Sequence, residues 1–224
     1  MEHAELIEHY PRLHHMAEAG SWPGIQQVGL MTTEQLVEAC APDEATQEAI
    51  LKQRRPRSYT LQHPVLGPVT VRDQGPLKEH NLRPALTDMT VQEWLEVLND
   101  RVFFWLHPDR LAKLLGAKLY RDATHDVLVL DTTELLAAHG DDVRLAGINT
   151  GATIFPNAPK RGSDTFTTVE NFPFAERRKG RSLRDAAVEL AVIGGVPDVS
   201  NFVLKVERRR GADVIDVLYE RSAS

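Results

Sequence analysis

Apolar residues occur along the chain in short stretches of two kinds, some at helical spacing and some in continuous or alternating runs. The clearest helix follows Thr90, which forms a capping box with Glu93 ahead of Trp94, Leu95 and Leu98. Start and stop signals of the same kind predict further helices within residues 21–29, after Thr32, over 42–53 and over 108–115.

Strands are predicted where β-branched and aromatic residues form short apolar runs between turn-forming residues. Residues 127–130 (Val-Leu-Val-Leu) are continuously apolar, which is typical of a strand covered on both faces. We therefore expect one α+β domain over residues 1–224, with its helices gathered in the N-terminal half. Further strands are expected over residues 65–71, 101–106, 186–193, 202–206 and 214–218, and the arginines at 208–210 are typical of a turn.

Two segments without periodicity are predicted as loops. Residues 149–164 contain two Gly, two Pro and several small polar residues, and residues 171–184 are strongly basic. A loop of this length inside a compact domain is more often functional than idle. The composition alone, however, favours a solvated, mobile connection.

Composition and charge exclude several classes of protein. Lys and Arg together number 26 against 32 for Asp and Glu, which gives a net charge of −6 at pH 7. A hydrophobic fraction of 42% with 26% charged residues is ordinary for a globular protein and excludes bulk disorder, collagen and coiled coil. Because the chain is acidic, any contact with nucleic acid must come from a local basic patch.

The search for common chemical motifs is negative. The single cysteine, Cys40, excludes an intrachain disulfide and a cysteine-based zinc site. The sequence contains no P-loop, no dinucleotide-binding glycine pattern, no H-E-x-x-H and no G-x-S-x-G. No apolar run approaches the roughly 20 residues that span a bilayer, and the first residues do not resemble a signal peptide. We expect a cytoplasmic protein without bound metal or membrane contact.

Glu189 interrupts an otherwise apolar strand, and it is the most informative residue of the chain. Burying a lone carboxylate costs several kcal/mol unless it is paired or hydrogen-bonded. An ion pair with an arginine such as Arg161 or Arg184 would make Glu189 structural. A functional carboxylate is the other interpretation.

Two weaker segments carry a histidine and a run of aromatic residues. An imidazole at His15, on a strand that leads into a turn, can donate and accept at once and suits a ribose hydroxyl, although a buried histidine satisfied by backbone is the simpler interpretation. Strand alternation puts Phe103 and Trp105 on one face and Phe104 on the other. Such rings are usually core, but one face could stack a flat heterocycle.

Taken in order, these segments resemble the ADP-ribosyltransferase superfamily, and in particular the DarT-type DNA ADP-ribosyltransferases and a related family of uncharacterised bacterial proteins. The opening "Y-H-x-T" strand of that pattern is similar to residues 13–17 (Leu-His-His-Met-Ala), so that His15 takes the histidine position, with His14 for Tyr and Ala17 for Thr. The short helix and "G-L" turn resemble residues 22–30. A helix ending in a basic pair resembles 50–55, the aromatic strand resembles 103–106, and the glutamate strand followed by "V-P" resembles 188–197.

The resemblance implies a split, mixed β-sheet and an enzyme that transfers ADP-ribose from NAD+ through an oxocarbenium-like transition state. Glu189 would stabilise the charge on the ribose. Arg54 or Arg55 would contact the pyrophosphate, and Phe104 or Trp105 would stack near the nicotinamide. The residues expected to bind NAD+ are His15, Met16, Ala17, Gly29, Leu30, Phe103, Phe104 and Trp105, and the expected catalytic residues are Glu189, Arg54 and Arg55.

The acceptor of the ADP-ribose is expected to be a nucleic-acid base, with DNA favoured. The basic residues upstream of Glu189 would then face the nucleic-acid backbone. Transfer to a protein side chain, hydrolysis of NAD+ and a catalytically inactive nucleotide-binding module are the alternatives. The resemblance also allows a toxin role with an antitoxin or regulatory partner. The expected nucleic-acid contacts are Lys160, Arg161, Arg177, Arg178, Lys179 and Arg181.

Overall fold

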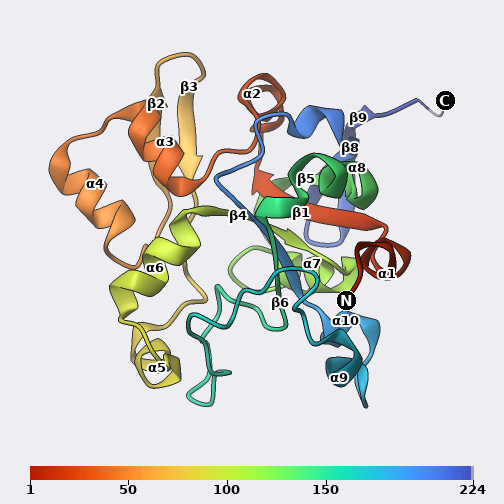
Figure 1. Ribbon diagram of the computed structural model, residues 1–224. Helices are drawn as coiled ribbons and strands as arrows, with labels where there is room; N and C mark the ends of the chain where they lie inside the picture. The colour runs from red at the N-terminus through yellow and green to blue at the C-terminus, as the bar shows by residue number, and fades with distance from the viewer. Residues whose placement is uncertain (223–224) are drawn as a thin grey trace.

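A seven-stranded sheet runs through the centre of the molecule, in the order β6-β7-β4-β1-β5-β8-β9 (Figure 1). The computed structural model describes residues 1–222. Every pairing between neighbouring strands is antiparallel, so the α+β class is confirmed and the expected mixed sheet is wrong. The continuously apolar residues 127–130 indicate a strand that is buried on both faces, and such a strand can pair in either direction; here it is antiparallel to both of its neighbours. The strands are β1 (Arg12–Glu18), β4 (Arg101–Trp105), β5 (Thr124–Asp131), β6 (Val143–Ala146), β7 (Glu189–Ile193), β8 (Val203–Arg210) and β9 (Asp213–Glu220).

The sheet opens between β1 and β4. These two strands share a single residue pair, His14 with Trp105, whereas β1 pairs with β5 along its whole length, from Arg12 to Glu18. The sheet therefore consists of two halves, β6-β7-β4 and β1-β5-β8-β9, that meet at one point. Beyond that point the ends of β1 and β4 leave space between them.

Most helices precede β5, as expected for helices gathered in the N-terminal half. Residues 19–100, here called the insertion, carry five helices and the hairpin β2 (Tyr59–His63) and β3 (Gly67–Val71), and they stand to the left and top of Figure 1. Both capping boxes form, at Thr32–Gln35 and at Thr90–Glu93. The helices are α1 (His3–His9), α2 (Trp22–Val28), α3 (Thr33–Cys40), α4 (Glu44–Leu51), α5 (Glu79–Leu82), α6 (Val91–Asn99), α7 (Pro108–Leu115), α8 (Thr132–His139), α9 (Phe174–Arg178) and α10 (Leu183–Ala186).

Three predicted boundaries are wrong. The segment 65–71 begins with a turn, so that its strand β3 starts only at Gly67; it pairs with β2, a strand that was not predicted. Residues 183–186 form α10, so that β7 begins at Glu189. The arginines at 208–210 belong to β8 and not to a turn, because the guanidinium of Arg208 is neutralised by the fully buried carboxylate of Asp126, with Nε 2.9 Å from Oδ1.

The main apolar core joins one face of the sheet to α1 and α8. Leu13, Phe104, Leu128 and Leu190 lie in it with 1% or less of their surface exposed. The insertion has a small core of its own, in which Val37 of α3 packs with residues of α4 and the hairpin. No helix within residues 1–222 combines the length and the apolar character needed to cross a membrane.

Candidate functional site

A cavity of about 600 Å³, here called the split cavity, lies where β1 and β4 separate. Its walls are the end of β1, the loop and helix α2 that follow, the strand β3, and the start of β4. The structure thus brings together segments that are nearly ninety residues apart in the sequence. The expected NAD+-binding residues that line it are His15, Met16, Ala17, Gly29, Leu30 and Phe103.

The "G-L" turn and the "V-P" segment of the sequence pattern lie against each other. Leu30 N donates to Val196 O at 2.9 Å, and Val196 N donates to Leu30 O at 2.8 Å. Gly29 has φ +83°, and a Cβ at this position would overlap Pro197 and the Val196 carbonyl. Glycine is therefore required both by the backbone conformation and by the close approach. This contact joins α2, on the cavity wall, to the segment that follows β7.

His15 is both a backbone-satisfied histidine and a wall residue of the split cavity. Its Nδ1 lies 2.8 Å from the carbonyl oxygen of Phe103, and its ring centroid lies 5.6 Å from that of Phe104. Burial lowers the pKa of His15 to about 4, so the imidazole is neutral at physiological pH. Because a carbonyl can only accept, the proton sits on Nδ1 and Nε2 is left as an acceptor.

Glu189 lies in the row of side chains at which the two halves of the sheet meet. It is opposite Trp105 on β4, which in turn is opposite His14 on β1. Residues directly opposite one another share a face of a sheet, so His14, and not His15, is on the face of Glu189. Phe103 is on this face too, two positions before Trp105. Glu189 does not line the split cavity, but it lies about 7 Å along the sheet from the row of Phe103.

The carboxyl group of Glu189 is buried, with 5% of the residue exposed. Its Oε2 accepts hydrogen bonds from Thr150 Oγ1 at 2.6 Å and from Thr150 N at 3.1 Å. Desolvation raises the pKa of Glu189 to about 7, although Thr150 and the charges of Arg161 and Arg110 act in the opposite direction. The group therefore exchanges its proton near neutral pH, as a general acid or base requires.

Arg161 supports this carboxyl group through Thr150. Its Nη1 donates to Thr150 O at 2.8 Å and its Nη2 to Ala152 O at 3.2 Å, and the guanidinium lies 5.8 Å from the Trp94 ring. Within residues 1–222 it makes no ion pair with Glu189. With 1% of its surface exposed, Arg161 cannot face a nucleic-acid backbone, and its guanidinium serves the wall beside Glu189 instead.

The aromatic rings of β4 lie on opposite faces of the sheet, as the alternation of side chains along a strand predicts. Phe104 points into the main core with 1% exposure, which leaves no ring face for a ligand. Trp105 packs on α7, against Leu111 and Leu115. Phe103 is the ring that borders the split cavity, with the ring of Phe166 at 6.1 Å.

Arg54 and Arg55 lie away from the split cavity. Arg55 is buried, and it donates to Ile50 O and Asn99 Oδ1 at 2.8 Å each, which ties α4 to α6. Burial lowers the pKa of Arg55 to about 10, so it stays charged. Arg54 donates to the carbonyls of Leu77 and Gly75 and lines a second cavity.

Sequence reasoning missed the two arginines that do line the split cavity. Arg72, at the end of β3, donates to Met16 O at 3.2 Å and lies 5.3 Å from the Tyr120 ring. Arg101, at the start of β4, has a buried Nε without a hydrogen-bond partner in residues 1–222, and desolvation lowers its pKa. Two guanidinium groups from two walls suit a diphosphate. No motif signalled them, because a single arginine beside a strand is common.

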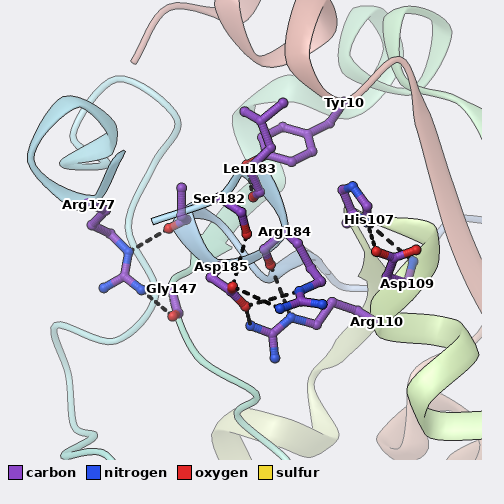
Figure 2. A network of polar contacts seen from close by, with 11 residues as sticks. Tyr10, His107, Asp109, Arg110, Gly147, Arg177, Ser182, Leu183, Arg184 and Asp185 are labelled. Atoms are coloured by element: carbon purple, nitrogen blue, oxygen red, sulfur yellow. Dashed lines mark hydrogen bonds and ion pairs between the residues drawn. The ribbon is translucent and has the colours of Figure 1, made fainter. Parts of the chain in front are cut away.

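Figure 2 shows that two arginines of the basic segment 171–184, Arg177 and Arg184, make polar contacts with other residues of the protein. Arg177 donates to Ala186 O at 2.6 Å and to Gly147 O, while Arg110 binds Asp185 and donates to Arg184 O at 3.0 Å. These contacts hold α10, which leads directly into Glu189 on β7. The expected nucleic-acid contacts that remain exposed are Lys160, Arg178, Lys179 and Arg181.

Comparison with known proteins gives a family but no activity. No curated protein matches this chain. The model of a family of unknown function, DUF7002, matches residues 11–203. That range begins just before β1 and ends at the first residue of β8, so it contains the split cavity, Thr150 and Glu189. The chain belongs to this family of unknown function, DUF7002.

Proposed function

We propose that this protein is an NAD+-dependent ADP-ribosyltransferase in which Glu189 is the catalytic carboxyl group. One observation carries the proposal: the buried carboxyl group of Glu189, with a pKa of about 7, lies about 7 Å along the sheet from the row of Phe103, which borders the cavity lined by the segments expected to bind NAD+. A purely structural carboxylate would gain from direct pairing with a cation. Glu189 instead receives its hydrogen bonds from Thr150 alone, within residues 1–222.

The architecture supports the same assignment. We assign the sheet to the split type that the resemblance implies, on the ground that β1 and β4 meet only at His14 and Trp105. The opening that results is lined by six of the eight residues expected to bind NAD+. The "G-L" turn and the "V-P" segment, distant in sequence, form a two-hydrogen-bond bridge beside it.

In the reaction, the bond between nicotinamide and C1 of the ribose breaks, and nicotinamide leaves with the bonding electron pair. The positive charge that develops on the ribose is stabilised by the carboxylate of Glu189, in a site from which most water is excluded. Oε2 is held by Thr150, and Oε1 receives no hydrogen bond from residues 1–222, which leaves it to the substrate. A nucleophile of the acceptor then bonds to C1 and passes its proton to Glu189.

The other wall residues have roles that follow from their chemistry. Neutral His15 offers Nε2 as an acceptor for a ribose hydroxyl. Arg72 and Arg101 face the two phosphates, a role that the resemblance gave to Arg54 or Arg55. Phe103 offers the aromatic surface at the cavity. The acceptor that we propose is a nucleic-acid base, since exposed cations occur on both long segments upstream of Glu189.

Incubation with NAD+ labelled in its adenine tests the proposal. The purified protein is offered single-stranded DNA, duplex DNA, RNA and cell protein in separate reactions, beside Glu189→Gln and the exposed control Glu220→Gln. We expect label in a nucleic-acid pool with wild type and with the control, and none with Glu189→Gln. Label in protein alone would show that the acceptor is a protein side chain and not a nucleic-acid base. NAD+ binding without label transfer or nicotinamide release would overturn the enzyme in favour of a nucleotide-binding module.

A further inference from the structure

A groove of about 420 Å³, here called the α3 groove, lies between α3, the end of α2, the end of β2 and the segment that follows β7. Helix α3 packs on β2 beside it (Figure 1). The first three of its apolar wall residues also border the split cavity, but the rest of its lining does not. The apolar side chains of the wall are Val28, Leu30, Met31, Ala39 and Pro197.

His63, the last residue of β2, presents a fixed hydrogen-bond donor at the α3 groove. Its Nδ1 accepts from Val65 N and from Leu66 N in the hairpin turn, both at 3.2 Å. Because backbone N–H groups can only donate, the ring proton lies on Nε2. The residue is only 8% exposed, and Nε2 has no hydrogen-bond partner within residues 1–222. Since His63 lines the groove, this N–H is left for an acceptor of a ligand or for solvent.

Glu38, on α3, adds one negative charge to the same groove. The residue is exposed, and its carboxylate makes no ion pair or hydrogen bond within residues 1–222. Gln35 is already engaged, because its Nε2 donates to Gly194 O at 2.8 Å and its Oε1 accepts from Thr32 N at 3.0 Å. In the described part of the chain, His63 and Glu38 are therefore the side chains of this groove that can bind a polar ligand group.

These groups select the class of ligand. An anion would be repelled by Glu38, and a purely apolar molecule would leave the Nε2–H of His63 without a partner. We propose that the α3 groove binds a small amphipathic amine: its apolar body lies on the apolar wall, an oxygen atom accepts from His63 Nε2, and its ammonium group faces Glu38. An apolar wall with a few fixed polar groups is typical of a small-molecule site. The inference does not rest on the proposed function, because neither Glu189 nor NAD+ takes part in it.

Tyramine is the probe, since it combines an aromatic body, a hydroxyl and an ammonium group. Its binding to the ¹⁵N-labelled protein is followed by NMR, and we expect saturable shifts of the His63 Nε2–H and of the Ala39 and Gly194 amides. Three analogues each change one group. Phenethylamine lacks the hydroxyl, 4-ethylphenol lacks the amine, and 3-(4-hydroxyphenyl)propionate carries a carboxylate in place of the amine.

Two conservative variants are matched to these analogues. His63→Asn keeps a side-chain acceptor for the turn amides but removes the Nε2–H, so tyramine and 4-ethylphenol should bind about fivefold more weakly and phenethylamine as before. Glu38→Gln should weaken tyramine and phenethylamine about threefold at low salt and leave 4-ethylphenol unchanged. Each variant is thus expected to affect only the probes that carry the group it contacts.

A third variant fills the groove. Ala39→Phe should abolish the binding of tyramine, whereas Ala45→Phe, on the exposed face of α4, should bind it like wild type. Urea unfolding curves verify that every variant is folded before affinities are compared.

Four results would overturn the assignment. They are the absence of saturable tyramine binding to wild type, equal tyramine affinity of Ala39→Phe and wild type, tighter binding of the propionate than of tyramine, and loss of 4-ethylphenol binding in Glu38→Gln but not in His63→Asn. A larger loss of tyramine binding in Arg72→Met than in Ala39→Phe would place the probe in the split cavity and would also overturn it.

Discussion

The hydrogen bond from Thr150 to Glu189 controls the pH at which the proposed catalytic group is ionised. Thr150→Val removes the hydroxyl that lies 2.6 Å from Oε2 and keeps the backbone N–H at 3.1 Å. A buried hydrogen bond to a charged group is worth about 1.5–3 kcal/mol. It favours the ionised carboxylate, so its loss raises the pKa of Glu189 above the present value of about 7.

The size of this change follows from the same numbers. One pH unit corresponds to about 1.36 kcal/mol, so we expect the pKa of Glu189 to rise by roughly one to two pH units in Thr150→Val. Glu189 acts as a carboxylate, and the rate of nicotinamide release should therefore rise with pH through about 7 in wild type. In the variant the midpoint should lie near pH 8 to 9, with the rate recovering at high pH.

Single-turnover release of nicotinamide from pH 5.5 to 9.5 provides the assay. Thr150→Ser keeps the hydroxyl and serves as the matched control, with a midpoint close to that of wild type. A midpoint in Thr150→Val that is unchanged or lower would refute the role given to this hydrogen bond. An equal loss of rate at every pH would show that Thr150 only maintains the structure.

Three further predictions concern stability and NAD+ affinity. Burial raises the pKa of Glu189, so the folded state holds this proton more tightly than the unfolded state and loses stability as pH rises from about 4.5 to 7. Glu189→Gln should therefore raise Tm by several degrees at pH 8, where the wild-type carboxyl is ionised, but not at pH 4. A lower Tm of the variant at pH 8 would identify Glu189 as a structural carboxylate. Gly29→Ala should cost at least about 2 kcal/mol in urea unfolding, because its Cβ meets Pro197, whereas Gly180→Ala, with positive φ but open space, should cost about 1 kcal/mol. Arg101→Met should weaken NAD+ binding at least tenfold in calorimetry, and it should also lower the urea midpoint, because Arg101 donates to Val97 O and its guanidinium lies 5.1 Å from the Phe166 ring; unaltered affinity in the folded variant would remove Arg101 from the diphosphate site.

Local patterns in the sequence predicted local structure well. The capping boxes at Thr32 and Thr90 both form, because they depend on residues three positions apart. The alternation that put Phe103 and Trp105 on one face and Phe104 on the other is also confirmed. In each case the cause lies within a few residues of its effect.

Features that depend on the packing of distant segments could not be predicted in this way. Arg161 looked like part of a basic surface, but it is buried against Trp94 and the carbonyl of Thr150. Conversely, Arg72 and Arg101 lacked a motif and lie on the split cavity. The place of an arginine side chain depends on the carbonyl groups and aromatic rings that the fold brings close to it. These groups come from distant segments, so the residues next to the arginine in sequence do not predict them.

The burial of Glu189 was foreseen from the apolar residues around it, and its partner was not. Arg161 and Arg184 were expected as possible ion-pair partners, whereas Thr150 holds the carboxylate and Arg161 acts through it. The reason is that Thr150 comes from a loop 39 residues earlier, and loop sequences carry little information on contacts.

Whether Glu189 is the catalytic carboxyl group of a transferase is decided by the release of nicotinamide from NAD+ in the presence of single-stranded DNA, with wild type and Glu189→Gln compared at pH 8. We expect steady release by wild type, with ADP-ribose recovered on the DNA, and a loss of at least a hundredfold in Glu189→Gln at unchanged NAD+ affinity. Equal release by both proteins, or none by wild type despite NAD+ binding, would contradict this assignment.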